Sequence, residues 1–333
     1  MESAQALNIA RSGWPHLVLP ASTAVRIVDG RLSDWPLWRI EANGHRYALR
    51  GWPTSELHRA RAALRFTAQA ASGGRVQLPV AIETHCGAAL HPQGDWHWEL
   101  APWLPGEADF AQRPTLARLE AMCRQLAVLH EETADLTTPD EPLAVQRHLQ
   151  ALTALQSGID AGRFAGLDPS ALPVPSPAGM TWSVAVGQAA EVATRQLAAL
   201  QAVRLNGQWT WGDAWHNNFL LVADEVTGLV DFATVRVDTP MADLARLLGS
   251  TTAENAEWWP AGVAAYADVQ TLSEADLQAT GALSASGTVL SLANWLEWLG
   301  VERRSFASPQ AVCDRMSHFA LRLTHLLRGR KSP

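Results

Sequence analysis

The sequence contains few cysteines. Its three, Cys86, Cys123 and Cys313, are widely separated and form neither a CxxC pair nor a Cys/His spacing typical of a metal site. A sparse, odd number of cysteines argues against a disulfide-stabilised secreted scaffold and is typical of the reducing cytosol. We therefore expect a cytoplasmic protein.

Signals for membranes and secretion are also missing. No apolar run approaches the roughly 18 residues needed to cross a bilayer, and residues 1–14 lack a basic head followed by an apolar stretch. The formal net charge is −7, from 26 basic and 33 acidic side chains. This balance argues against a nucleic-acid partner and favours a neutral or cationic small-molecule partner. We expect no membrane partner and a monomer or weak dimer.

The sequence is long enough for two lobes, and one segment of it carries candidate catalytic residues. The 333 residues, 47% of them hydrophobic, suffice for two sizeable cores. Within residues 209–249, Asp213 and Asn218 lie five apart in a loop-like segment rich in Gly, Asn and Trp. The next residues predict a strand at 219–223, a turn at 224–228 and a second strand at 229–232, which would return Asp231 to that loop.

Two carboxylates and a carboxamide that converge on one point are costly unless a cation lies among them, and Mg²⁺ with phosphate oxygens is the usual occupant. The spacing Asp-x-x-x-x-Asn, followed by an Asp after a hairpin, is the catalytic pattern of kinases. An isolated Asp or Asn in a loop is more often a turn or cap residue. Three such residues in register with a hairpin favour a catalytic site.

The segments at 211–218, 230–233 and 238–245 resemble those of the aminoglycoside phosphotransferase and choline kinase-like family. The family patterns His-Gly-Asp-Leu-His-Pro-Gly-Asn, Ile-Asp-Phe-Gly and Gly-Asp-Pro-x-x-Asp-Leu-Ala align with them without a gap. The resemblance implies that Asp213 is the base that orients the acceptor hydroxyl. It also implies that Asn218 and Asp231 are magnesium ligands and that Asp243 is a structural carboxylate.

The chain departs from the family pattern at several positions. Trp211 and Trp215 replace the two histidines of the catalytic motif, and His216 either substitutes for the second histidine or packs. Ala233 replaces a glycine, and Thr234 stands where many members carry a second acidic residue. The Asp-Asn-Asp set itself is intact.

The resemblance implies an α+β, two-lobed protein kinase-like fold. We expect residues 1–105 to form a small antiparallel-sheet N-lobe with one helix, and residues 106–333 to form a larger, mainly helical C-lobe with the catalytic loop and the acceptor site. Strands are predicted at 24–28, 37–41, 46–50, 78–81 and 96–103, with a hairpin turn at Asn43-Gly44 and a polar turn at 91–95. Helices are predicted from Thr54 onward and at 114–133, 143–155, 183–204, 252–269, 274–280, 288–299 and 309–327.

The nucleotide site is expected in the N-lobe. The turn around Gly30 lies where kinases carry the phosphate-covering loop, and Ser33 would offer a hydroxyl or a backbone N–H there. With one glycine, a plain hairpin is equally consistent. Arg50 stands at the strand where kinases carry a lysine, and arginine can hold phosphate oxygens bidentately; a surface arginine is the alternative.

Glu56 is the only acidic residue in the following helical segment, so we expect it to pair with Arg50. An alternative alignment places Ala60 at that position and leaves Arg50 without this partner. Residues 98–109 resemble the linker of the family, in which adenine binds to the backbone near residues 99–103. This implies a nucleotide contact near Glu99 and Ala101.

The remaining residues predict the acceptor side. His130 ends a helix and is expected to be a helix-terminal contact rather than a catalyst. The proline-rich stretch within 137–181 is expected near the acceptor site. Several side chains of the last helices are candidates for the acceptor pocket, although packing in the core is the default interpretation. These are Trp258, Trp259, Trp295, Glu297 and Trp298.

We therefore expect an ATP-dependent phosphotransferase that uses Mg²⁺ and moves the γ-phosphate to a hydroxyl of a small molecule. The alternative is a catalytically inactive, kinase-like protein that binds nucleotide or another ligand. The weak glycine turn and the uncertain helix glutamate favour the alternative, and the intact Asp213, Asn218 and Asp231 oppose it. The choice between ATP and GTP and the identity of the acceptor stay open.

Overall fold

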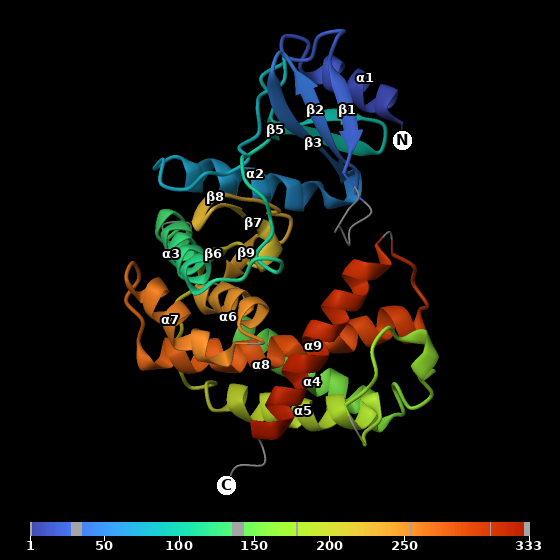
Figure 1. The fold of residues 1–333 in the computed structure, drawn as a ribbon, viewed down its shortest axis with the longest axis vertical. Helices are drawn as coiled ribbons and strands as arrows, with labels where there is room; N and C mark the ends of the chain where they lie inside the picture. The colour runs from blue at the N-terminus through green and yellow to red at the C-terminus, as the bar shows by residue number, and fades with distance from the viewer. Residues whose placement is uncertain are drawn as a thin grey trace.

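A computed structural model describes residues 2–27, 35–134, 143–177, 179–253, 255–306 and 308–329. It shows a small lobe built on a β-sheet above a larger helical lobe (Figure 1). The predicted α+β, two-lobed kinase-like fold is confirmed. The small lobe contains an antiparallel sheet of order β1-β2-β3-β5-β4. Its strands are β1 (Thr23–Arg26), β2 (Leu37–Ala42), β3 (His45–Pro53), β4 (His91–Gln93) and β5 (Trp96–Pro102).

The predicted hairpin turn joins β2 to β3. Asn43 and Gly44 have φ of 53° and 76°, the pair of left-handed residues that a two-residue turn between antiparallel strands requires. The register then sets Trp38 opposite Leu49. Because side chains alternate along a strand, this register sends Leu49 into the core and its neighbour Arg50 to the other face.

Helix α1 (Ser3–Gly13) covers one face of the sheet, although the sequence analysis assigned no element to these residues. Its buried positions 6, 9, 10 and 13 have helical spacing, which was the available signal. Ile9 packs in one cluster with Trp14, Trp38 and Ile40. A second core of the small lobe therefore lies on the sheet face away from the helical lobe.

Two predicted elements of the small lobe were wrong. Residues 78–81 form no strand, and Pro79 among them has no N–H to contribute to a ladder. The segment is held instead through Ile82, whose N–H donates to the Leu100 carbonyl oxygen at 2.7 Å. Strand β4 lies where a polar turn was predicted, because His91–Gln93 pairs with the first residues of β5.

The large lobe is mainly helical, as predicted. Its helices are α3 (Leu116–Glu132), α4 (Ala144–Asp160), α5 (Trp182–Ala198), α6 (Pro240–Thr251), α7 (Trp259–Ala267), α8 (Glu274–Leu296) and α9 (Pro309–Gly329). Two short ladders accompany them: β6 (Gln208–Thr210) with β9 (Arg236–Asp238), and β7 (Phe219–Val222) with β8 (Glu225–Leu229). Among the described residues, no helix is long and apolar enough to cross a bilayer.

Helix α8 corrects another prediction, since the sequence indicated two helices at 274–280 and 288–299. Gly281 and Gly287 lie within one continuous helix. A glycine lowers helix stability by about 1 kcal/mol, which packing can offset. Helix α8 packs against α4, α5, α6 and α9, and this burial maintains it through both glycines. A π-helical turn, Glu297–Val301, follows its end.

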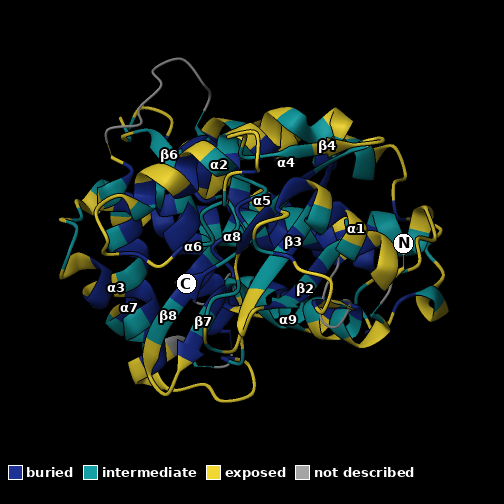
Figure 2. Ribbon diagram, turned by 90° about the horizontal axis from the view of Figure 1, so that it is seen from above, coloured by how far each residue is buried: buried dark blue, intermediate teal, exposed yellow. Residues whose placement is uncertain are grey.

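The helix of the small lobe, α2 (Leu57–Ala71), shares its core with the large lobe. Phe66 is buried, and its ring centroid lies 5.6 Å from that of Phe232, which follows β8. Viewed from above, buried residues run through the middle of the molecule where these elements overlap (Figure 2). The division into lobes at residue 105 stays a prediction, and α2 is the element that joins them.

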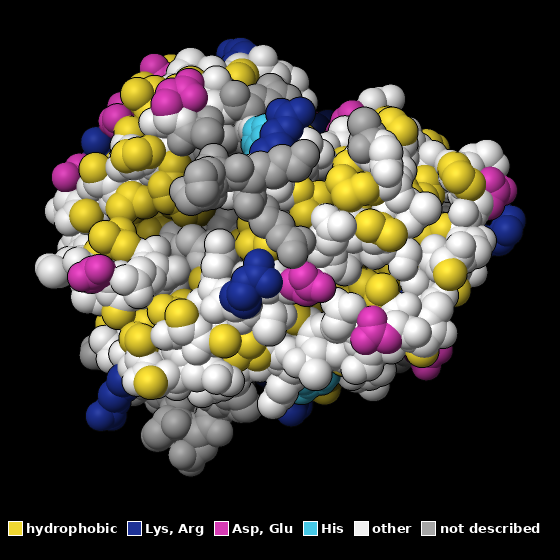
Figure 3. Space-filling view, turned by 90° about the horizontal axis from the view of Figure 1, so that it is seen from below, with side chains coloured by type: hydrophobic (Ala, Val, Ile, Leu, Met, Phe, Trp, Pro, Cys, Tyr) yellow, Lys and Arg dark blue, Asp and Glu magenta, His cyan; other side chains and the backbone are white. Residues whose placement is uncertain are grey.

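On the face of the large lobe seen from below, the described charged side chains are scattered among polar and hydrophobic ones (Figure 3). The basic side chains drawn there do not gather into one broad patch. A nucleic-acid site needs such a concentration of positive charge. This face, as far as its described side chains show it, has no such concentration.

Candidate active site

The loop between β6 and β7 carries Asp213 and Asn218. Gly212 has φ of 80°, and a Cβ atom there would lie 2.3 Å from the Thr234 carbonyl oxygen, so the position requires glycine. Next to it, the Trp215 N–H donates to the Asp213 carbonyl oxygen at 2.7 Å. The Asn218 Nδ2 donates to the same oxygen at 2.9 Å. The loop is therefore tightly closed, and Asn218 fixes the backbone that presents Asp213.

Asp231 lies just beyond the hairpin, and the predicted second strand was placed too late. Strand β8 ends at Leu229, and the Val230 N–H donates to the Asn218 carbonyl oxygen at 3.0 Å. Asp231 has φ of 63°, which is incompatible with an extended strand. A left-handed aspartate of this kind costs free energy and persists only where its surroundings hold it.

Trp211 supplies that support. Its indole is fully buried and stacks on Phe232, with ring centroids 5.1 Å apart and an angle of 21° between the planes. Its Nε1–H donates to the Asp231 carbonyl oxygen at 2.8 Å. The tryptophan that replaces the first histidine of the family motif thus holds the backbone of a candidate metal ligand.

Arg50 reaches the same place from the small lobe. Its Nη2 lies 3.0 Å from the Asp231 Oδ1, and its guanidinium carbon lies 4.3 Å from the centroid of the Trp52 ring. The side chain is 13% exposed, so it is enclosed between the lobes rather than on the outer sheet face. Lys331 is the only lysine of the chain, so the cation at this strand must be an arginine.

The expected pairing of Glu56 with Arg50 is wrong. Glu56 lies in the short 3₁₀ turn Thr54–Glu56 that precedes α2, and its Oε2 is 3.3 Å from Arg59 Nε. One turn later, the inward position is held by the buried Ala60, which has no carboxylate. The sequence offered Glu56 as the only acid in the segment, but the helix register decides which position faces Arg50.

A second acid beside Arg50, in addition to Asp231, comes from the sheet. Glu99 on β5 is the direct cross-strand neighbour of Arg50. Its Oε2 accepts a hydrogen bond from Trp52 Nε1 at 2.8 Å. Burial raises the pKa of Glu99, and the charge of Arg50 acts in the opposite direction. Glu99, Trp52 and Arg50 thus form one group on the sheet face toward the large lobe.

The backbone groups of Glu99 and Ala101, which were predicted to bind the nucleotide, are already used in the sheet. The Trp103 N–H donates to the Arg46 carbonyl oxygen at 2.9 Å. Bonded pairs recur at every second residue of an antiparallel ladder, so the backbones of Ala101 and Glu99 bond to β3. Any nucleotide contact of these two residues must use their side chains. Gly30 and Ser33 lie outside the described residues.

A cavity of about 930 Å³ connects these groups across the lobes. The predicted residues that line it are Arg50, Glu99, Ala101, Asp213, Asn218, Asp231, Trp295 and Trp298. Trp258 and Trp259 are not part of this lining, and Glu297 pairs with Arg163 at 2.9 Å. Sequence reasoning missed three arginines of the lining, Arg246, Arg304 and Arg315.

Asp213 has an ion-pair partner in the large lobe. Arg246 on α6 lies 2.5 Å from the Asp213 Oδ1. The sequence allowed His216 either to substitute for the second histidine of the motif or to pack in the core. It is buried, and its Nδ1 lies 3.0 Å from the Ser250 carbonyl oxygen. Burial, aided by the charge of Arg315, lowers the pKa of His216 to about 3. His216 is therefore a neutral packing residue.

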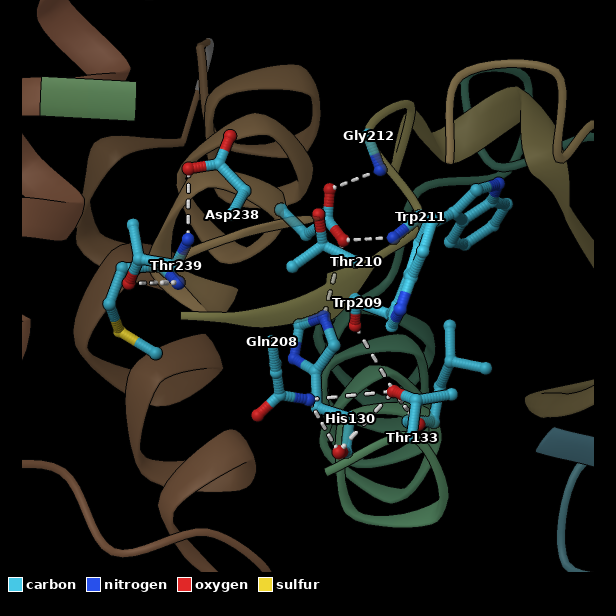
Figure 4. A network of polar contacts seen from close by, with 12 residues as sticks. His130, Thr133, Gln208, Trp209, Thr210, Trp211, Gly212, Asp238 and Thr239 are labelled. Carbon is cyan, nitrogen blue, oxygen red and sulfur yellow. Dashed lines mark hydrogen bonds and ion pairs between the residues drawn. The ribbon is translucent and has the colours of Figure 1, made fainter. Parts of the chain in front are cut away.

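Asp243 at the start of α6 binds the backbone of the loop that carries Asp213. Its oxygens accept the N–H groups of Trp211 and Gly212, both at 2.8 Å, and lie 3.2 Å from His130 Nε2. The end of α3 joins the same network, since Gln208 Nε2 donates to the His130 carbonyl oxygen (Figure 4). The geometry agrees with a structural role for Asp243 and with a contact role for His130.

We expect Asp243→Ala to destabilise the fold by about 2–4 kcal/mol, because it leaves buried N–H groups without acceptors. Urea unfolding at equilibrium measures this. Asp268→Ala serves as the control, because its ion pair with Arg124 is exposed and contributes less than about 1 kcal/mol. Equal losses in both variants would contradict the role of Asp243.

The residues present fit a magnesium ion. Asp231 and Asn218 offer carboxylate and carboxamide oxygens, the ligand types that Mg²⁺ prefers. Within the described ranges, no group of three or more His, Cys, Asp or Glu side chains is placed to hold a metal. A magnesium ion here would therefore depend on phosphate oxygens and water for the rest of its ligands, which is usual for Mg²⁺ at nucleotide sites.

The fold and the site define a kinase-like phosphotransferase. The sequence profile of the phosphotransferase enzyme family matches residues 25–278, more than half of the chain, and the chain belongs to this family. The expectation of a phosphotransferase enzyme is thereby confirmed. No curated protein matches the chain by sequence.

Solved structures share the fold at low sequence identity. One is a spectinomycin phosphotransferase in complex with ADP and spectinomycin, with 10% identity, a TM-score of 0.68 and 98% of each chain covered. Another is a microcompartment-associated aminopropanol kinase, with 17% identity, a TM-score of 0.70 and coverage of 98% of this chain and 96% of that chain. A third is an amicoumacin kinase with AMP-PNP and Ca²⁺, with 13% identity, a TM-score of 0.67 and coverage of 98% and 94%. The adenine nucleotides and the divalent ion of these complexes agree with the expected cofactors, ATP and Mg²⁺.

Proposed function

We propose that the protein transfers the γ-phosphate of ATP to a hydroxyl of a small molecule. The observation that carries the proposal is the convergence of Asp213, Asn218, Asp231 and Arg50 on one cavity between the lobes. Phosphoryl transfer needs positioning and charge neutralisation more than covalent participation of the protein. We assign nucleotide binding to the small lobe, acceptor binding to the large lobe, and the reaction to the cytoplasm.

Each residue of the cavity has a distinct part in this proposal. Asp213 accepts the proton of the acceptor hydroxyl as its oxygen attacks the γ-phosphorus, and Arg246 holds the carboxylate in place. Asn218 and Asp231 would hold Mg²⁺, which neutralises charge between the phosphate oxygens. Arg50 binds the phosphates from the small lobe, and Glu99 with Trp52 orients its guanidinium.

The decisive experiment measures nucleotide binding and turnover together. Calorimetric titration with ATP, in the presence and absence of Mg²⁺, is followed by a γ-phosphate transfer assay against a panel of small alcohols. We expect Mg²⁺ to increase affinity and at least one alcohol to be phosphorylated. A protein that binds ATP equally with and without Mg²⁺ and transfers nothing would be the inactive, ligand-binding alternative.

Substitution of Arg50 tests the nucleotide side. Arg50→Ala is expected to raise the KM for ATP and lower kcat, with kcat/KM reduced about 10- to 100-fold, because phosphate positioning persists in the transition state. Arg50→Lys is expected to retain only part of the activity, since lysine has no planar fork. Glu56→Ala is the control, because Glu56 pairs with Arg59. A normal KM for ATP in Arg50→Ala would contradict the assignment.

A further inference from the structure

The end of the cavity beyond Asp213 is positively charged. Arg246, Arg304 and Arg315 line it. Two of these arginines have acidic partners: Arg246 pairs with Asp213, and Arg304 pairs with Glu302. The net charge of −7 favoured a neutral or cationic partner, but this part of the cavity has the opposite sign.

Arg315 differs from the other two arginines. It projects from α9, and its guanidinium carbon lies 3.8 Å from the centroid of the Trp215 ring. Within the residues that the structure describes, no carbonyl or carboxylate oxygen accepts a hydrogen bond from Arg315. A guanidinium has five N–H donors, and no nitrogen of Arg315 is among the buried side-chain atoms without a partner, so its donors are open to the cavity.

A second positive charge lies close to Arg315. Arg246 lies against the same indole, with its guanidinium carbon 5.5 Å from the Trp215 centroid, so two positive charges share one ring. Burial, followed by the charge of Arg246, lowers the pKa of Arg315 to about 10, and Asp213 opposes this shift. Arg315 stays protonated at neutral pH, so the site holds a permanent positive charge that an anion would neutralise.

The other cavity walls on this side are aromatic and uncharged. Trp295 packs against both Trp298 and Phe306, with ring centroids 5.2 Å apart in each case. Ser291 and Asn294 add neutral polar groups to the lining. A multiply cationic acceptor would need several unpaired carboxylates here, whereas Asp213 already has Arg246 as its partner.

We propose that the acceptor is an anionic alcohol, a small molecule that carries both the reacting hydroxyl and an oxyanion, carboxylate or phosphate, bound by Arg315. The inference rests on the proposed phosphotransfer function and names its substrate class. The acceptor oxygen forms a bond to the γ-phosphorus, the bond from that phosphorus to the β-bridging oxygen breaks, ADP leaves, and the hydroxyl proton passes to Asp213.

The test compares acceptors that differ in charge. One set is D-gluconate, D-glucose and D-glucosamine; a second is L-3-phenyllactate and its amide; D-glucose 6-phosphate represents the phosphate oxyanions. Transfer from γ-labelled ATP is measured for each, and Mg-ATP binding is measured separately. We expect an acid to be phosphorylated with a higher kcat/KM than its neutral and amino counterparts, and the phosphate compound distinguishes phosphate from carboxylate recognition.

Variants of Arg315 connect the preference to this residue. Arg315→Gln is expected to lower kcat/KM for the best anionic acceptor by about 10- to 100-fold, because a charge-assisted hydrogen bond is lost. Activity toward the matched neutral alcohol should change little, and Arg315→Lys should restore part of the preference. Arg328→Gln is the control, since Arg328 is exposed on the same helix.

The outcomes separate this inference from the proposed function. Failure to bind Mg-ATP would overturn both. If Mg-ATP binds but a neutral or amino compound is the best acceptor, or no acid is phosphorylated, the inference alone is overturned. It is also overturned if Arg315→Gln weakens Mg-ATP binding and leaves the preference for acids unchanged, which would assign Arg315 to the nucleotide. If Arg315→Gln does not fold, the comparison of acid, neutral and amino acceptors with the wild-type protein still decides the inference, and Arg315→Lys, which keeps the charge but has no planar fork, tests the residue.

Discussion

Asp213→Asn is expected to lower kcat by about 10²–10⁴ while the fold and the affinity for Mg-ATP stay close to those of the wild type. Asparagine has nearly the size of aspartate but cannot accept the proton of the attacking hydroxyl. The carbonyl oxygen of residue 213, which holds Asn218 and Trp215, is unchanged by the substitution. The loss should therefore appear in the chemical step, measured as single-turnover phosphate transfer at saturating ATP.

Two further variants make this result specific. Asp314→Asn changes an exposed acid on α9 and should have wild-type turnover. Arg246→Gln removes the ion-pair partner of Asp213 but leaves the base, so its loss should be smaller than that of Asp213→Asn. Wild-type turnover in Asp213→Asn would remove Asp213 from the mechanism.

Asp231→Asn is expected to weaken Mg-ATP binding far more than binding of metal-free ATP, and to lower kcat by about 10²–10³. The carboxylate is the charged member of the candidate metal site, and Mg²⁺ held there would neutralise phosphate charge. Asparagine is the suitable replacement because it tolerates the left-handed backbone, with φ of 63°, better than alanine does. Calorimetry with and without Mg²⁺, together with the transfer assay, measures both effects.

The same substitution also removes a charge from beside Arg50, which binds Asp231 at 3.0 Å. If removal of this charge acted only through Arg50, the affinity for ATP would fall equally with and without Mg²⁺. The comparison between the two titrations therefore distinguishes loss of a metal ligand from displacement of Arg50. Equal weakening in both titrations would indicate that Asp231 only positions Arg50.

The sequence predicted the candidate catalytic centre well because the spacing of its residues is local. Asp213, Asn218 and Asp231 lie in one loop and the hairpin that follows, so short-range geometry brings them together. The details depended on packing: Trp211 holds the backbone of Asp231, and the left-handed conformation at Asp231 ends β8 earlier than the hydrophobic pattern indicated.

The nucleotide side was only partly determined by the sequence. The hairpin at Asn43-Gly44 fixed the register of β3 and therefore the face on which Arg50 projects. The second acid beside Arg50, which the sheet supplies in addition to Asp231, could not be found in this way. Glu99 becomes its neighbour by strand pairing over a long sequence separation, and Glu56 was misplaced because one helical turn changes the face of a residue.

By itself, the sequence determined the class of fold, the candidate catalytic set and the absence of a lysine from the third strand, because motif spacing and composition are properties of the chain. Only the tertiary structure decided the charge at the end of the cavity beyond Asp213. Arg246 and Arg315 come from helices α6 and α9, which are far apart in the sequence, and meet at the ring of Trp215. A net charge sums over the whole surface, whereas a binding site responds to the few charges that packing brings within several ångströms of it.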